Sequence, residues 1–219
     1  MKMPTTTFNI NIAWSPDSNY IAVGNRSEIV SVMDVRGGGA LVKRSRFPYL
    51  MNEFVWSANS DYLLAATGEG AIDIINPEDL KFLETITAHV GGCEHLKVDS
   101  TYRRMAITSV DCVLSFWDLD DLVCHNTLSF ESEIKTISFS GDGQYLAAVE
   151  GKAAIPENST GIQHLAICNS DTGEFVTKIT QSLRPREHIA ILAWHPRISN
   201  LIAAGIDNNG VRLISFPNA

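Results

Sequence analysis

The chain has 219 residues, of which 45% are hydrophobic and 19% are charged, and its formal net charge is −8. This is the composition of an ordinary soluble globular protein with a sizeable core, and the acidic balance argues against a broad phosphate-binding surface, which would need clustered Lys and Arg. No apolar run approaches the roughly 18 residues of a membrane-spanning helix, and the first dozen residues do not resemble a signal peptide. We therefore expect an intracellular protein with no membrane partner and with reduced cysteines.

One short phrase returns along the chain. AWSPDSNYIAV begins at Ala13, VWSANSDYLLA at Val55 and AWHPRISNLIA at Ala193. Taking the aromatic residue of the phrase as an anchor gives five anchors, at intervals of 42, 42, 41 and 55 residues. The positions two before, seven after and eight after every anchor are also apolar, which predicts a repeat protein. The anchors are Trp14, Trp56, Val98, Phe139 and Trp194.

Each repeat begins with an apolar run that ends near the anchor, and turn residues separate this run from a second one. In the first repeat the turn is Ser15-Pro16-Asp17-Ser18, and two short runs joined by such residues predict a β-hairpin. We expect Trp14 and Ile21, on either side of this turn, to face the core between sheets. A third run follows in every repeat and a weaker fourth run in the first four. The third strands are expected at 29–34, 72–76, 113–118, 164–169 and 211–215, and the fourth at 40–47, 81–87, 122–130 and 174–180.

Four antiparallel strands every 40–45 residues or so are the signature of a WD-type propeller blade. Helical repeats of similar period would show apolar residues at i, i+3 and i+4, and these segments do not. The predicted fold class is all-β, a WD40-type β-propeller with five blades visible in this chain, which is open or partial if the chain is truncated. We expect one domain over 1–219, with blades at about 8–49, 50–90, 91–131, 132–182 and 187–219.

The third repeat carries the marks of a WD repeat most fully. Ala88-His89 precedes it where the family usually has Gly-His, and its third strand ends in Trp117-Asp118. The resemblance implies a buried polar tetrad, because a buried imidazole, carboxylate and indole N–H must satisfy one another. We expect this tetrad to be structural rather than catalytic. Carried over by position, its members are His89, Thr108 or Ser109, Asp111 and Trp117.

Several segments resemble one family more closely than they resemble WD repeats in general. They include AWSPDSNYIAVGN, SFWDLDDLVC and AWHPRISNLIAAGIDNNGVRLISFPN, which lie in this order along the chain. WDLDDLVC is the most specific piece, because its acidic pair and the following Val-Cys are not general features of WD repeats. Together these segments resemble the WD-repeat subunit of the THO complex (the subunit 3 family), which is a core of the TREX mRNA-export assembly.

The resemblance implies a non-catalytic scaffold subunit that helps to couple transcription and processing to nuclear mRNA export. It implies a location in the nucleus, other THO and TREX subunits as protein partners, and RNA contact only through the complex. We expect no cofactor, no metal and no small-molecule substrate, and no pair of cysteines or histidines has the spacing of zinc ligands. The alternative is another WD-repeat adaptor, in a ubiquitin ligase or a chromatin complex, since propellers serve many roles.

The chain departs from this family in two ways. Family members resemble seven-bladed propellers, so we expect either a fragment or a closed five-blade ring in which residues 2–7 supply a missing strand. The longest interval has its excess at 150–163, between the second and third strands of the fourth blade. Long loops on rigid scaffolds often contact partners, although the Gly, Pro, Asn and Ser content here also fits a tolerated excursion. Its candidate contact residues are Lys152 and Asn158.

The best case for an enzyme is a group of polar residues near the innermost strands. Glu53, Glu94 and His95 are expected near the mouth of the central channel, where paired carboxylates could serve a hydrolase. The interpretation we favour is a polar rim that contacts a partner. Asp171-Thr172-Gly173 spells an aspartic-protease motif, but it occurs once and falls at a turn, so we expect no catalytic role for it.

Overall fold

The computed structural model describes residues 8–151, 161–183, 187–207 and 210–216. Nineteen β-strands form five antiparallel sheets in these residues, which confirms the all-β prediction. No helix there is long and apolar enough to cross a membrane. The chain divides into two compact units, Met1–Leu96 and Lys97–Ala219, and each is described by itself. Residues 2–7, together with Lys152 and Asn158, lie outside the described residues.

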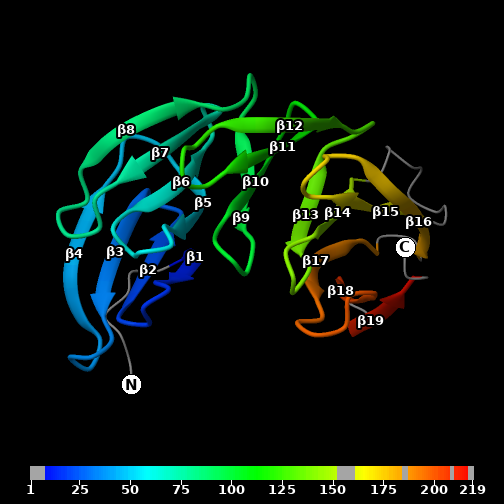
Figure 1. Ribbon diagram of the computed structural model, residues 1–219. Helices are drawn as coiled ribbons and strands as arrows, with labels where there is room; N and C mark the ends of the chain where they lie inside the picture. The colour runs from blue at the N-terminus through cyan, green and yellow to red at the C-terminus, as the bar shows by residue number, and fades with distance from the viewer. Residues whose placement is uncertain (1–7, 152–160, 184–186, 208–209, 217–219) are drawn as a thin grey trace. The chain divides into compact units, whose positions relative to one another are not determined.

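The first unit contains two four-stranded sheets, and their inner strands β1 and β5 lie side by side (Figure 1). Apolar side chains from both sheets form one core between them, including Ala22, Val30, Phe54, Trp56 and Leu63. The first sheet has β1 (Asn9–Trp14), β2 (Tyr20–Asn25), β3 (Ile29–Asp34) and β4 (Ala40–Arg46). The second has β5 (Met51–Trp56), β6 (Leu63–Thr67), β7 (Ala71–Ile75) and β8 (Phe82–Thr87).

The second unit contains two further four-stranded sheets and a sheet of three described strands. The boundary between the units falls within β9, the first strand of the third sheet. This sheet has β9 (Cys93–Val98), β10 (Arg104–Ser109), β11 (Val113–Asp118) and β12 (Cys124–Ser129). The fourth has β13 (Ile134–Phe139), β14 (Tyr145–Glu150), β15 (Gly161–Asn169) and β16 (Phe175–Leu183), and the fifth has β17 (Ile189–Trp194), β18 (Leu201–Ile206) and β19 (Gly210–Ser215).

The predicted hairpins between first and second strands are confirmed, and they share one turn chemistry. In the first repeat the Ser15 hydroxyl accepts a hydrogen bond from the Tyr20 amide at 2.8 Å. Ser18 closes the turn with a φ of 62°, in the left-handed region that Gly adopts without strain. The same arrangement recurs one repeat later, where the Tyr62 amide donates to Ser57 at 3.1 Å and Ser60 has a φ of 66°, and again at Ser140 and Gly143.

The prediction that Trp14 faces a core is wrong. Ile21 is buried as expected, but Trp14 is 54% exposed, and Ile12 on the same side of β1 is 68% exposed. In the described part of the first unit, no sheet packs against this side of β1. Trp56, the equivalent residue of β5, is 2% exposed because the first sheet covers it and Tyr20 stacks on its ring.

Candidate functional site

Two of the predicted rim residues lie together at the inner strands of the first unit. His95 Nδ1 is 3.5 Å from Glu53 Oε2, and the same carboxylate oxygen accepts a hydrogen bond from the Leu96 amide at 3.0 Å. Glu53 therefore holds the inner strand of one sheet to the next, as a structural carboxylate. Glu94 is half-buried beside His95. Contact of these residues with a partner stays a prediction.

Asparagine side chains make a similar bond between successive inner strands. Asn11 on β1 donates from Nδ2 to the carbonyl of Met51 at 3.0 Å, and Asn52 on β5 donates to the carbonyl of Cys93 at 2.7 Å. Each bond joins a side chain of one repeat to the backbone of the next. The inner-strand polar residues thus have a structural use, which the sequence alone did not separate from a binding role.

In the predicted tetrad, Trp117 has a partner that the sequence analysis missed. Its indole Nε1 donates to the hydroxyl of Ser115 at 2.7 Å, two residues earlier on β11, and both side chains are buried. Thr108 and Ser109 are also buried, in the adjacent strand β10. The sequence offered a signal for Ser115, because it is a polar residue inside the otherwise apolar run VLSFW.

The other tetrad candidates lie at turns. Ser109 Oγ accepts from the Asp111 amide at 3.2 Å, and the Asp111 carboxylate accepts from the Val113 amide at 3.0 Å, so these residues shape the turn between β10 and β11. His89 is buried and belongs to the first unit, whereas the other members belong to the second. The tetrad as a whole stays a prediction.

A buried carboxylate in the second sheet was not predicted. Asp73 lies in the middle of β7 with no exposed surface, and it accepts hydrogen bonds from Tyr49 Oη at 2.6 Å and Thr85 Oγ1 at 2.7 Å. Burial, reinforced by the hydrogen bond to Asp73, raises the pKa of Tyr49 to about 12. Both donors satisfy the carboxylate from within the protein, so Asp73 is a structural group.

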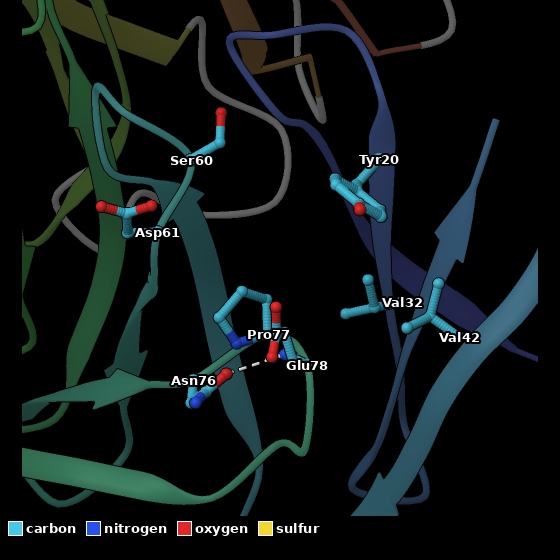
Figure 2. A pocket seen from close by; sticks show the side chains of 8 residues that line it. All are labelled: Tyr20, Val32, Val42, Ser60, Asp61, Asn76, Pro77 and Glu78. Atoms are coloured by element: carbon cyan, nitrogen blue, oxygen red, sulfur yellow. Dashed lines mark hydrogen bonds between the residues drawn. The ribbon is translucent and has the colours of Figure 1, made fainter. Parts of the chain in front are cut away.

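Surface grooves lie between neighbouring sheets within each unit. One of them, here called the open groove, lies between the first and second sheets and has a volume of about 510 Å³. Figure 2 shows Tyr20, Val32 and Val42 of the first sheet on one side of it. Turns of the second sheet supply the remaining wall and base, namely Ser60, Asp61, Asn76, Pro77 and Glu78.

Two smaller grooves lie at equivalent places in the second unit. The arginine groove, between the third and fourth sheets, has a volume of about 350 Å³ and contains Arg104 and Asp171. The phenylalanine groove, between the fourth and fifth sheets, has a volume of about 170 Å³ and contains Tyr145 and Phe216. In the described residues, no group of three or more His, Cys, Asp or Glu side chains could hold a metal ion.

Sequence comparisons place this architecture among known proteins. No protein-family model matches the chain. It is 34% identical over 202 residues to THO complex subunit 3 of Arabidopsis thaliana, an alignment that covers 92% of this chain and 59% of that protein. It is 27% identical over 144 residues to the WD repeat-containing protein AAC3 of Dictyostelium discoideum, covering 63% of this chain and 30% of that protein.

A solved structure supports the fold. The Cps50 (Swd1) β-propeller domain of Myceliophteria thermophila matches 95% of this chain and 83% of its own, with a TM-score of 0.64 and 16% sequence identity. At that identity the likeness concerns the fold alone, and it confirms the predicted propeller class. Because the chain aligns with a THO complex subunit over 92% of its length, the predicted resemblance is confirmed. The chain is a WD-repeat β-propeller protein homologous to THO complex subunit 3.

Proposed function

We propose that this chain is a non-catalytic scaffold subunit of a THO-type complex in the nucleus, where it helps to couple transcription and processing to mRNA export. The observation that carries this proposal is the 34% identity over 92% of the chain to THO complex subunit 3. The chain spans 59% of the length of that relative. The proposed partners are the other protein subunits of the complex, and RNA is reached through them.

Several buried polar side chains form hydrogen bonds within the protein, and this structural use supports a scaffold role. Asp73, Trp117 and Gln163 are all buried and all donate or accept hydrogen bonds within the protein. Gln163, for example, accepts from the Ile189 amide at 2.7 Å and so ties the fourth sheet to the fifth. Exposed polar groups such as Asp61 and Glu78 lie on turns beside the open groove, and rigid scaffolds often present binding residues in such loops.

Affinity purification of the tagged chain from the organism that encodes it tests this proposal. We expect other THO subunits and an export helicase to copurify, and we expect their recovery to survive RNase treatment because the contacts are between proteins. The same tag on an unrelated WD-repeat protein is the control. Recovery of a ubiquitin ligase or a histone modifier without any THO subunit would overturn the proposal in favour of another adaptor role.

A second measurement separates indirect from direct RNA contact. The purified chain carries a net charge of −8, so we expect no strong association with single-stranded RNA at low salt. A tight association whose strength falls steeply with salt concentration would show that the chain itself neutralises phosphates.

A further inference from the structure

The three grooves are versions of one repeat feature, so each can be compared residue by residue. Tyr20, Arg104 and Tyr145 all lie six residues after the anchor of their repeat, and each lines its groove. In the third strands, Ile75 pairs with Leu63 and Cys168 pairs with Leu146. Three residues further on in each case come Glu78 and Asp171, which are therefore equivalent and line the open and the arginine groove.

The arginine groove contains a bound cation that the protein itself supplies. Arg104 Nη2 forms an ion pair with the Asp171 carboxylate, and Nη1 donates to the carbonyl of Gly143 at 3.2 Å and to the hydroxyl of Ser170 at 3.4 Å. Only 21% of the Arg104 side chain is exposed. One guanidinium thus binds a carboxylate, a carbonyl and a hydroxyl of the next sheet, using the several donors that its planar fork provides.

A side chain of the protein also narrows the phenylalanine groove. Phe216 lies two residues after Ile214, as Pro77 lies two residues after Ile75, so a large ring stands where the open groove has a proline. The Phe216 ring packs edge-on against Trp194, with their centroids 5.8 Å apart. This difference in side-chain size agrees with the difference in volume, about 170 Å³ against about 510 Å³.

The open groove keeps the carboxylate and the turn carbonyl of the arginine groove, but it has Pro77 in place of Ser170 and no cation among the residues that line it. Glu78 stands at the position of Asp171, whereas Tyr20 stands at the position of Arg104. In the described residues, neither Glu78 nor Asp61 forms an ion pair. The nearest of the cations is held within the first sheet, because Arg36 is 2.7 Å from Asp34 and donates to the hydroxyl of Tyr20 at 2.9 Å.

Two lysines interact with a different carboxylate, Asp79, which does not line the groove. Lys81 Nζ is 3.0 Å from the Asp79 carboxylate, and the positive charge of Lys43 also lowers the pKa of Asp79. The residues that line the open groove therefore carry two carboxylates, Asp61 and Glu78, and no positive charge. Its remaining wall is apolar, with Val32 and Val42 opposite those turns (Figure 2).

We propose that the open groove binds an arginine side chain from an extended segment of a partner protein. The guanidinium pairs with Glu78 as Arg104 pairs with Asp171, and its methylene stem packs on Val32 and Val42. Ser60 stands at the position of Gly143, so its carbonyl is the equivalent acceptor. This inference rests on the proposed scaffold function, for which it names the chemistry of one partner segment.

The affinity of a single arginine in this groove is expected to be modest. Asp61 and Glu78 are exposed, and ion pairs at exposed sites are screened by water and salt. In an assembly such a contact fixes the position of a segment that is already tethered by other contacts, so a weak local affinity is sufficient.

The test uses the full 219-residue chain and a labelled, capped peptide of sequence Ser-Gly-Val-Arg-Val-Gly-Ser, with fluorescence anisotropy as the measurement. We expect saturable binding that weakens at high salt. Replacing the peptide arginine by citrulline keeps the shape but removes the charge, and it should weaken binding by about two- to fivefold, as expected for an ion pair at an exposed site. A peptide with glutamate at this position should not bind.

Two variants of the chain address the groove directly. Glu78→Gln should weaken binding by about two- to fivefold, since it removes the charged acceptor of an exposed ion pair. Pro77→Phe copies the ring of the phenylalanine groove and should abolish binding by filling the space. The matched control is Glu84→Gln on β8, which makes the same change of net charge at an exposed acidic residue outside the groove and should bind as the unmodified chain does. If Pro77→Phe does not fold, as judged by its thermal transition, Asp61→Asn takes its place and should weaken binding severalfold.

The inference is overturned if the unmodified chain does not bind the peptide, or if citrulline or Glu78→Gln leaves the affinity unchanged. These results can be distinguished from failure of the proposed function. Copurification of THO subunits without peptide binding would reject the groove and leave the scaffold role intact. Peptide binding without any THO subunit in the purification would reject the THO-type assembly and leave the groove as a site for another partner.

Discussion

Trp14 and Trp56 lie at the same position of consecutive repeats, and their surroundings are opposite. Trp56 is 2% exposed, its indole donates to the carbonyl of Ala13 at 3.1 Å and its ring stacks on Tyr20. Trp14 is 54% exposed. Trp194 resembles Trp56, because it is 7% exposed and stacks on Tyr145. An anchor is thus buried by the preceding sheet and not by its own, so equal sequence positions can differ widely in what they contribute.

The largest expected effect on stability comes from replacing the two tryptophans by alanine, one at a time. Trp56→Ala should lower the free energy of unfolding by about 3–5 kcal/mol, the usual cost of deleting a large buried aromatic side chain. Trp14→Ala should lower it by less than about 1 kcal/mol, because that ring is already largely in water. Urea denaturation of both variants measures this difference, and equal losses would show that Trp14 is covered in solution.

A second pair of equivalent positions, at the turn between second and third strands, also differs in its surroundings. Gly70 and Cys112 each lie fourteen residues after their anchor, with φ of 80° and 64°. A Cβ added at Gly70 would lie 2.4 Å from the carbonyl oxygen of His89, whereas Cys112 already carries one. We expect Gly70→Ala to cost about 2–4 kcal/mol, from left-handed strain and displaced backbone. Cys112→Ala should cost less than about 1 kcal/mol. Thermal unfolding of the two variants measures this difference. Equal transition temperatures for Gly70→Ala and Cys112→Ala would contradict the crowding at Gly70.

Polar residues at a third set of equivalent positions also differ. Asp73, Ser31 and Ser115 each lie two residues before the last buried residue of their third strand, but only Asp73 carries a charge and needs two donors. Tyr49→Phe removes one donor and should lower the free energy of unfolding by about 1–3 kcal/mol. Phe has the same ring, so lost packing contributes little. An unchanged stability would mean that water replaces the phenol.

The same variant has a signature at alkaline pH. The folded-state pKa of Tyr49 is about 12, above the usual value near 10, so the unfolded chain loses this proton first as pH rises. The contribution of Tyr49 to stability should therefore be present below about pH 10 and fall between about pH 10 and 12. In an ultraviolet titration, the tyrosine that ionises at the highest pH should disappear from the curve of Tyr49→Phe. If that ionisation remains, it belongs to another tyrosine.

The strands could be predicted from the sequence because their signals are local. The third strand of the third repeat was expected at 113–118 and is observed at Val113–Asp118. Alternation of apolar residues and the turn residues on either side define such a strand without reference to any neighbour. The hydroxyl of Ser15 likewise bonds within its own hairpin, so the turn followed from the quoted phrase.

Features that depend on residues far away in the sequence were beyond the same reasoning. The exposure of Trp14 depends on what covers β1, and the burial of Asp73 depends on donors twelve and twenty-four residues away along the chain. Asp171 was recognised as a turn residue, but its pairing with Arg104 joins residues 67 apart in sequence. The repeat frame places Glu78 and Asp171 at one position, and only the structure shows that a cation has taken one of them and not the other.

The variant with the smallest expected effect on stability tests this difference between Glu78 and Asp171. Arg104→Met keeps the length and apolar stem of the side chain but removes the cation. Asp171 is 57% exposed, so loss of the pair should cost at most about 1 kcal/mol, and less at high salt. The freed Asp171 would then resemble Glu78, and the variant should bind two arginine peptides of the kind proposed above where the unmodified chain binds one. Because stability barely changes, an altered stoichiometry in calorimetric titration would report the grooves themselves. A stoichiometry that stays at one would mean that the neighbouring turns, and not the unpaired carboxylate, decide which groove accepts an arginine.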